Sequence, residues 1–291
     1  MTAIAHCDHR WRSDSADNAA FVANLAQTWR LPCHLEIADS PPNSEAAARQ
    51  WRYQVFETLS LTHGYAYVVT GHTASDRAET LLYNLIRGSG ADGLQALVWR
   101  RPLSPCHPEI QLVRPLLEVT RAETSQFCQE CGLPIWEDCT NQNLQYARNR
   151  IRQELSPYLQ THFNPQVEKN LAQTAEVLTA EVDYLEAAAA QVFEQAVTRV
   201  RENDRDNPNL RLHRPILQST PLALQRRVVR RFLQQTLPHH PNFDQVEKLI
   251  ALICAPNRSR TDPFPGGRIA KVEGEWIVMV RAFPSANGIA D

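Results

Sequence analysis

Short apolar runs alternate with longer amphipathic stretches over the first half of the chain. The apolar runs predict strands at residues 3–7, 33–37, 66–70 and 110–113. Helical spacing, with a capping residue before it or a glycine after it, predicts helices at about 15–29, 43–63, 73–87 and 120–132. Residues 99–109 carry three prolines and predict a loop. Strands that alternate with helices in this way indicate parallel βαβ units.

The pattern changes near residue 141, and from there to about residue 237 the apolar spacing is helical. One long helix is expected at about 165–200, and an arginine-rich helix begins at Thr220 and Pro221. A further helix covers about 243–254, and residues 268–281 alternate like a hairpin. The predicted fold class is α/β: a Rossmann-like parallel sheet with helices on both faces, followed by a mostly helical C-terminal domain.

The bulk composition narrows the class of protein. A net charge of −2 excludes a chain-wide electrostatic nucleic-acid binder, so RNA contact must come from local patches. Residues 199–231 form one such patch, with nine arginines and three acids. Seven scattered cysteines argue for a reducing cytosol. No apolar run reaches the roughly 18 residues of a membrane helix, and no apolar signal core follows the N-terminus. We expect a soluble cytoplasmic protein.

Polar side chains gather where the strand at 66–70 ends. His72 follows Gly71, and Asp76 and Glu79 lie three residues apart in the first turn of the next helix. The carboxylates can hold Mg²⁺ or position a nucleophile. The alternative is a plain helix start, because Thr73 and Asp76 fit a capping box and acids suit a helix N-terminus. Spacing alone favours the helix start, and His72 alone is an ordinary loop histidine.

Three further clusters are candidates for binding. His6, Asp8, His9 and Arg12 follow the first strand, either as a ligand-binding loop or as a solvated one. Arg148 and Arg152 lie one helical turn apart and can grip phosphate, unless they only end a basic surface helix. The helical arginines that suit RNA backbone contact, or equally a solvated face, are Arg226, Arg227, Arg230 and Arg231.

Two other patterns favour structural interpretations. Cys128 and Cys131 have the spacing of a redox or metal pair, but no second pair accompanies them, which favours buried structural thiols. Residues 88–93 resemble a glycine-rich phosphate loop. They follow a helix instead of preceding one, however, and a phosphate cradle needs the N–H groups of a helix start.

Taken together, these stretches resemble the tRNA(Ile)-lysidine synthetases of the PP-loop (N-type) ATPase superfamily, whose fold is adenine nucleotide alpha hydrolase-like. The matching stretches cover about residues 1–160 in the order of the family, and they are residues 6–12, 45–53, 71–80, 87–94, 114–117, 137–138 and 147–152. Each is weak alone, whereas the ordered set is specific. The basic helical remainder is similar in position to the linker and tRNA-binding domain of that family.

The resemblance implies a ligase that forms a carbon–nitrogen bond in the tRNA(Ile) with the CAU anticodon. ATP adenylates the first anticodon cytidine at C2, free L-lysine displaces AMP, and lysidine results. The chemistry implies Mg²⁺ to balance the pyrophosphate charge and a pocket for an extruded base. Dimerisation as a homodimer is compatible with this interpretation.

The resemblance also implies roles for particular residues. Asp76, Glu79 and Arg148 become the catalytic candidates, and Asp76 and Glu79 also the magnesium candidates. The residues expected near ATP are His6, Asp8, His9, His72 and Arg114. The residues expected to contact tRNA are Arg49, Arg52, Arg152, Arg226, Arg227 and Arg230. The implied domains are an N-terminally truncated PP-loop ATPase domain at 1–160, a helical linker at 161–215 and a tRNA-binding domain at 216–291.

The chain departs from the family pattern in two ways. Thr73 and Arg77 replace a histidine and a glutamine of the usual turn. This departure is minor because Asp76 and Glu79 are both present. The Ser-Gly-Gly-x-Asp-Ser loop, which in the family follows a central first strand, occurs nowhere in the chain. We therefore expect an incomplete or truncated chain that binds ATP poorly and has two unpaired strand edges.

Two other functions stay open. A related PP-loop tRNA thiolase would use Cys128 and Cys131 for sulfur or an iron–sulfur cluster. A catalytically inactive remnant would bind tRNA without releasing AMP from ATP.

Overall fold

The computed structural model describes residues 2–136, 143–199 and 210–281. It divides into two compact units, Met1–Thr179 and Ala180–Asp291, which are described here one after the other. Two features predicted from the sequence lie outside the described residues: the change of pattern near residue 141 and the stretch 137–138.

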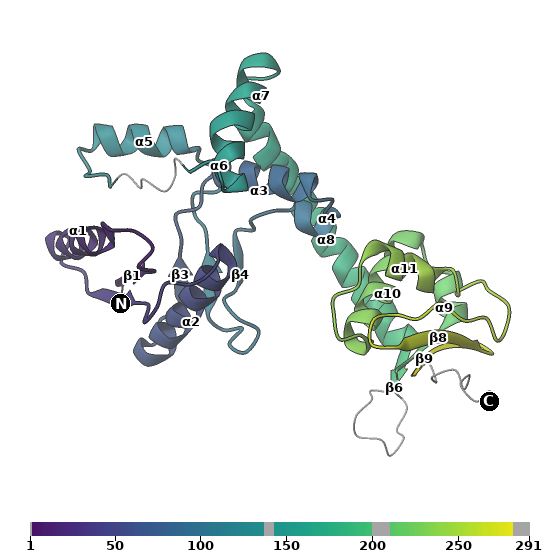
Figure 1. The fold of residues 1–291 in the computed structure, drawn as a ribbon. Coiled ribbons are helices and arrows are strands. Elements are labelled where there is room, and N and C mark those ends of the chain that lie inside the picture. The colour runs from purple at the N-terminus through teal and green to yellow at the C-terminus, as the bar shows by residue number, and fades with distance from the viewer. Residues whose placement is uncertain (1, 137–142, 200–209, 282–291) are drawn as a thin grey trace, which may run out of the picture. The chain divides into compact units, whose positions relative to one another are not determined.

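Strands and helices alternate in the first unit as the sequence predicts (Figure 1). Strand β1 (Ile4–Asp8) pairs in parallel with β2 (Cys33–Ile37), and β3 (Tyr67–Val69) pairs in parallel with β5 (Gln111–Val113). The helices that follow these strands are α1 (Ser15–Thr28), α2 (Glu45–His63), α3 (Ala74–Ile86) and α5 (Arg121–Glu130). The predicted parallel α/β class is therefore confirmed.

Part of the predicted loop at 99–109 is a strand. Strand β4 (Arg100–Pro102) pairs antiparallel with β5, and Leu103 N–H donates to the Ile110 carbonyl at 2.8 Å to close the hairpin. Proline is tolerated here because β4 is the edge strand of the order β3-β5-β4, where a missing N–H costs no ladder bond. The prediction of a loop, which relied on the three prolines, was therefore wrong for residues 100–102.

The two pairs of parallel strands form separate sheets among the described residues. β1 pairs only with β2, and β3 pairs only with β5 and not with β1. A cavity of about 470 Å³ is lined by residues of β1, β3 and the end of α2. Tyr67 and Val69 of β3 are exposed. Among the described residues, β1 and β3 therefore each have one edge without a paired strand.

Side-chain caps fix where the helices of this unit begin. Ser44 Oγ accepts from Ala47 N–H at the start of α2, which ends at Gly64 with a φ of 70°. Thr73 and Asp76 form a capping box on α3, and Thr120 and Glu123 form one on α5. Both boxes follow the carboxyl ends of the neighbouring strands β3 and β5, so the two helix starts lie close together.

The rest of the unit is helical. It comprises α4 (Ala91–Leu94), α6 (Ala147–Arg150), a π-helical turn η2 (Ile151–Leu155), α7 (Ser156–His162) and the first part of α8 (Val167–Ala196). The turn η2 joins α6 to α7 without a break. Turns of this kind are rare and are frequently found at functional sites.

Arg77 ties α3 to α8. It is 1% exposed, and its Nη1 donates to Glu176 Oε2 at 2.6 Å while its Nη2 donates to Thr179 Oγ1 at 3.3 Å. Trp99 Nε1 donates to the same carboxylate oxygen at 2.9 Å. The arginine that replaces the family's glutamine therefore serves packing between two helices.

We expect Arg77→Gln to lower the free energy of unfolding by about 1–2 kcal/mol, because the shorter amide loses the charged bond to Glu176. Urea denaturation followed by tryptophan fluorescence measures this, since five of the six tryptophans lie in residues 1–179. Arg87→Gln, at the exposed end of the same helix, is the control and should shift the midpoint little. Equal shifts in both variants would contradict a packing role for Arg77.

The second unit contains more sheet than the sequence predicts. Strands β6 (Val197–Arg199), β7 (Leu210–His213), β9 (Trp276–Arg281) and β8 (Arg268–Glu273) form one antiparallel sheet in that order. Helices α9 (Arg214–Gln218), α10 (Leu222–Thr236) and α11 (Phe243–Ile250) share one hydrophobic core with this sheet (Figure 1). The core combines Leu212 and Ile277 of the sheet with Phe232 and Leu249 of the helices. The hairpin at 268–281 and the helical character are confirmed, but β6 and β7 fall where only helix was expected.

Candidate functional site

The start of α3 is held against the loop after β5. Ala74 N–H donates to the Val119 carbonyl at 2.8 Å, and Thr73 forms an isolated bridge with Leu116. Asp76 Oδ2 accepts from Thr73 N–H at 2.8 Å and from its hydroxyl at 2.7 Å. Asp76 Oδ1 faces away from the cap and accepts from Arg121 Nη2 at 2.8 Å. One carboxylate therefore caps the helix with one oxygen and contacts Arg121 with the other, which confirms the helix-start interpretation, and the functional interpretation stays a prediction.

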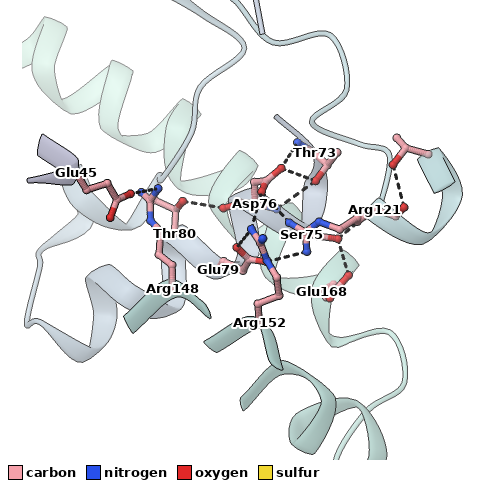
Figure 2. A network of polar contacts seen from close by, with 11 residues as sticks. Glu45, Thr73, Ser75, Asp76, Glu79, Thr80, Arg121, Arg148, Arg152 and Glu168 are labelled. Atoms are coloured by element: carbon pink, nitrogen blue, oxygen red, sulfur yellow. Dashed lines mark hydrogen bonds and ion pairs between the residues drawn. The ribbon is translucent and has the colours of Figure 1, made fainter. Parts of the chain in front are cut away.

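Glu79 is the buried member of the carboxylate pair, with 4% of its surface exposed. Two arginines bind it from different elements, as Figure 2 shows. Arg121 Nη1 donates to Glu79 Oε1 at 2.9 Å. Arg152, on η2, donates from Nε to Oε1 at 2.9 Å and from Nη2 to Oε2 at 3.0 Å. This two-point contact fixes the orientation of the Glu79 carboxylate.

The environment of Asp76 and Glu79 does not fit a magnesium site. Two guanidinium groups face the two carboxylates, and Arg152 Nη2 also lies 3.5 Å from Asp76 Oδ1. The formal charges of the four groups cancel, whereas Mg²⁺ is held by oxygen ligands of net negative charge. No cluster of three or more potential metal-ligating side chains exists within residues 2–136, 143–199 and 210–281.

Arg121 was not among the residues singled out from the sequence. It is the first residue of α5, directly after the Thr120 cap. Because β3 and β5 are parallel neighbours, their carboxyl ends bring the starts of α3 and α5 together. The sequence predicted both the capping box at Thr120 and the parallel sheet. Together these two predictions imply that Arg121 lies near Asp76 and Glu79.

A small polar cavity of about 100 Å³ opens beside the carboxylates. Its lining residues are Arg49, His72, Asp76, Glu79, Thr80, Leu97, Arg148 and Arg152. Six of these were predicted from the sequence as site residues, in the catalytic, ATP and tRNA groups. Arg148 Nη1 lies 3.4 Å from Glu45 Oε1 at the start of α2. The structure thus gathers side chains from α2, α3, α6 and η2 around one cavity of mixed charge.

His72 is neutral in this setting. Burial, reinforced by the nearby Arg114 guanidinium, lowers the pKa of His72 to about 4. Its Nδ1 lies 2.8 Å from Thr70 Oγ1. For Asp76, burial acts to raise the pKa, but the hydrogen bonds from Thr73 and the charge of Arg121 outweigh it, so the pKa lies below its ordinary value. At neutral pH the cavity therefore contains a neutral imidazole and an ionised Asp76.

Arg114 is buried behind this cavity. Its Nη1 donates to the Val98 carbonyl at 2.6 Å, and its buried Nε has no hydrogen-bond partner within the described ranges. Burial lowers the pKa of Arg114, and the nearby Tyr53 opposes this effect. Arg114 acts on the cavity through its charge, because it is not among the lining residues.

The predicted cluster after β1 forms a second polar site. Asp8 Oδ1 accepts from Arg10 N–H at 2.7 Å, which shapes the turn, and Arg10 has a φ of 56°. The His9 ring packs against Trp11 and Trp51, and its Nε2 lies 3.3 Å from Arg52 Nη2. Burial, together with the charge of Arg52, lowers the pKa of His9, and burial also lowers that of His6.

This second site fits a nucleotide in part. His9 Nδ1 is buried without a hydrogen-bond partner among the residues described here, so the site offers an unused polar atom next to two indole rings. Arg52, expected to contact tRNA, lies at His9, whereas Arg49 stacks on Tyr53 one turn earlier on α2. Aromatic faces and a guanidinium are groups that bind a purine ring and its phosphates.

The arginines of α10 are paired within the second unit. Arg226 donates to Glu247 from Nε at 2.7 Å and from Nη2 at 3.2 Å, and its guanidinium lies over Phe243. Arg227 donates to Glu186, and Arg231 lies over Phe193. RNA contact by Arg226, Arg227 and Arg230 stays a prediction, and Arg226 and Arg227 would exchange an acidic partner for phosphate.

The thiol pair is not buried as expected. Cys128 is half-buried and Cys131 is exposed, and both are free. The cause is the position of α5, which has no fully buried residue. The preference for buried structural thiols was therefore wrong for Cys131.

Comparisons with known proteins place this site in a family. Residues 1–159 match the model of the PP-loop domain, so the class is that of PP-loop proteins. Residues 212–276 match the TilS substrate binding domain. The tRNA(Ile)-lysidine synthases of a Nostoc species and a Synechocystis species are 62% and 50% identical over 95% and 94% of this chain, and over 82% of each of those proteins. The same enzyme of Thermosynechococcus vestitus is 52% identical over 96% of this chain and 78% of that protein. The chain belongs to the tRNA(Ile)-lysidine synthase family.

A solved structure, the U34-tRNA thiolase NcsA of Methanococcus maripaludis, covers 60% of each chain with 13% identity and a TM-score of 0.48. This similarity is too low to support a thiolase function. No described helix is long and apolar enough to cross a membrane.

Proposed function

We propose that the protein is an ATP-dependent ligase that converts the first anticodon cytidine of tRNA(Ile) with the CAU anticodon into lysidine. The observation that supports this most directly is the cavity in which Asp76 and Glu79 lie beside Arg148 and Arg152. Free lysine is a zwitterion that carries two ammonium groups, so a pocket with both signs of charge matches it. The family assignment supplies the reaction, and the cavity supplies a place for the amino acid.

The reaction has two steps. The C2 oxygen of the cytidine takes the adenylyl group of ATP, and pyrophosphate leaves. The ε-ammonium of lysine first loses a proton to solvent. The neutral ε-amine then attacks C2, AMP leaves with the C2 oxygen, and the nitrogen releases a further proton to solvent. The C2 oxygen therefore becomes a leaving group before the carbon–nitrogen bond forms.

The carboxylates and arginines have separate tasks in this proposal. Asp76 and Glu79 hold the α-ammonium of lysine, which leaves the ε-amine free to react. Arg148 is positioned to stabilise the negative charge that develops on the phosphate. The neutral His72 accepts or donates a hydrogen bond in the cavity without adding charge.

The site after β1 is proposed for ATP. His6, Asp8, His9 and Arg52 supply polar atoms there, and the rings of Trp11 and Trp51 supply an apolar surface. We further propose that residues 216–291 bind tRNA and that residues 161–215 link them to the ATPase domain of residues 1–160. Homodimer formation and a magnesium ion bound by the pyrophosphate stay predictions.

The experiment measures lysidine formation at varied lysine and at varied ATP for wild type and Asp76→Asn. We expect the KM for lysine to rise about 10- to 30-fold in Asp76→Asn, because one carboxylate charge facing the ammonium is lost. The KM for ATP should change far less. Asp17→Asn is the matched control, because Asp17 is also an acid in the first turn of a helix but lies exposed on α1.

Two results would contradict the proposal. A rise in the KM for ATP without a rise in the KM for lysine would indicate that the carboxylates act on ATP and not on lysine. Binding of tRNA without ATP-dependent AMP release in the wild-type chain would favour the inactive remnant.

A further inference from the structure

Arg121 bridges the two carboxylates that the proposed function assigns to lysine. Its Nη2 lies 2.8 Å from Asp76 Oδ1 and its Nη1 lies 2.9 Å from Glu79 Oε1. Figure 2 shows Arg121 reaching the pair from one element and Arg152 reaching it from another. Arg121 therefore balances charge on both carboxylates.

The two arginines hold the pair differently. Arg152 makes both of its shorter contacts to one residue, Glu79, with the geometry of a bidentate pair. Arg121 divides its contacts, with one bond to each carboxylate, and its side chain is 37% exposed against 26% for Arg152. A contact through one nitrogen to each carboxylate, at a more solvent-exposed position, is weaker than the bidentate contact of Arg152. Arg121 is thus the cation that is easier to displace.

The backbone of Arg121 does not depend on its guanidinium. Its N–H donates to Ser75 Oγ at 3.0 Å, and Ser75 Oγ donates to Glu168 Oε2 at 2.8 Å. The Thr120–Glu123 capping box holds the same turn, and Lys169 Nζ lies 2.8 Å from Glu123 Oε1. The guanidinium can therefore leave the carboxylates while the start of α5 stays in place.

An ammonium group can take over both contacts of Arg121. It carries a single positive charge and three N–H donors, so it can donate to Asp76 Oδ1 and Glu79 Oε1 at once. The local charge stays balanced during such an exchange, which avoids the cost of an unpaired buried charge. The guanidinium of Arg121 and the ammonium of the substrate would therefore compete for one position.

We propose that Arg121 is an exchangeable counter-ion of the lysine site. It pairs with Asp76 and Glu79 when lysine is absent, and the α-ammonium of lysine displaces it. Arg121 acts on lysine through Asp76 and Glu79, because it competes with the ammonium for them and so sets how tightly lysine binds. This inference rests on the proposed function, since it requires that the pair binds lysine.

The exchange has a measurable consequence. When only a fraction of the protein molecules has the site open to ligand, the apparent Kd equals the intrinsic Kd divided by that fraction. Replacing Arg121 by an uncharged residue removes the competitor and should therefore tighten lysine binding. A direct catalytic or binding contact would have the opposite effect, because its loss raises the KM.

The test compares Arg121→Gln with Arg121→Lys in lysidine formation. We expect the KM for lysine to fall about three- to tenfold in Arg121→Gln. In Arg121→Lys, which keeps a competing cation, the KM should stay closer to that of wild type. Methylguanidinium added to Arg121→Gln should raise the KM for lysine competitively, because it restores the missing cation. A rise in the KM for lysine in Arg121→Gln would overturn the proposal.

A second measurement follows lysine binding in the wild-type protein and uses a variant only to assign one signal. The Nε–H signals of the arginine side chains are followed by NMR, and the signal of Arg121 is identified by its loss in Arg121→Lys. Saturating lysine should shift the Arg121 signal more than that of Arg152. An Arg121 signal that lysine leaves unchanged would also overturn the proposal.

Asp76→Asn separates this inference from the proposed function. If Asp76→Asn raises the KM for lysine and Arg121→Gln raises it too, only the exchange is wrong. If neither substitution changes the KM for lysine, the carboxylate pair does not bind lysine, and the proposed site fails together with the exchange.

Discussion

Replacing Glu79 by glutamine is expected to destabilise the first unit by about 3 kcal/mol and to abolish lysidine formation. Glu79 is buried, and two guanidinium groups bind it. Removing one partner of a buried pair costs about 3–5 kcal/mol, because the remaining charge is left without compensation. The lower end applies here, since Arg121 and Arg152 are partly exposed and Asp76 stays in place.

Stability and activity can be separated for this substitution. Urea denaturation followed by tryptophan fluorescence gives the stability of the first unit, and lysidine formation is assayed well below the unfolding midpoint. Glu45→Gln is the control: Glu45 also pairs with an arginine, Arg148, but its side chain is 61% exposed. It should change the free energy of unfolding by less than about 0.5 kcal/mol. A Glu79→Gln protein as stable as the control would show that the pair is not a structural contact.

The second large effect concerns pH. His72 has an ordinary pKa of 6.5, and in the folded protein the pKa is lowered to about 4, mainly by burial. Between these values the unfolded chain binds a proton that the folded chain does not. The contribution of His72 to stability is therefore complete above about pH 6.5 and is lost as the pH falls toward 4. The loss over this window amounts to about 3 kcal/mol.

The measurement is the free energy of unfolding at intervals between pH 7 and pH 4 for wild type and for His72→Asn. Asparagine can keep a hydrogen bond to Thr70 but does not titrate in this range. Burial also lowers the pKa of His6 and His9, so both proteins lose some stability on acidification. The difference between the two curves isolates His72. Parallel curves would contradict a buried, neutral histidine at this position.

The sequence predicts those parts of the structure that local residues determine. The capping boxes of Thr73 and Thr120 involve contacts three residues apart, and both are present. The parallel strands follow from apolar runs between helices. Strands β6 and β7 were missed because they have only three and four residues, too few to show a period of two against the surrounding helical spacing.

The partners of the site residues depend on contacts between distant segments. Glu79 is 42 residues from Arg121 and 73 from Arg152, so no local spacing reveals these pairs. Arg77 shows the same limit, because its partner Glu176 is 99 residues away. The sequence therefore singled out Asp76 and Glu79 but did not show that two arginines pair with them.

The π-helical turn also changes how Arg148 and Arg152 work together. Their spacing of four residues predicts one common face. In η2 the Ser156 N–H bonds to the Ile151 carbonyl, so the turn holds one residue more than an α-helical turn. Arg148 contacts Glu45 on α2, and Arg152 contacts Glu79 on α3. An extra residue rotates the following helix by about 100° relative to an unbroken α-helix. Deleting one residue of η2 would thus leave the composition of the site unchanged and yet rotate α7 away from its present packing. The turn makes chain length itself, and not only residue identity, a determinant of how α7 packs.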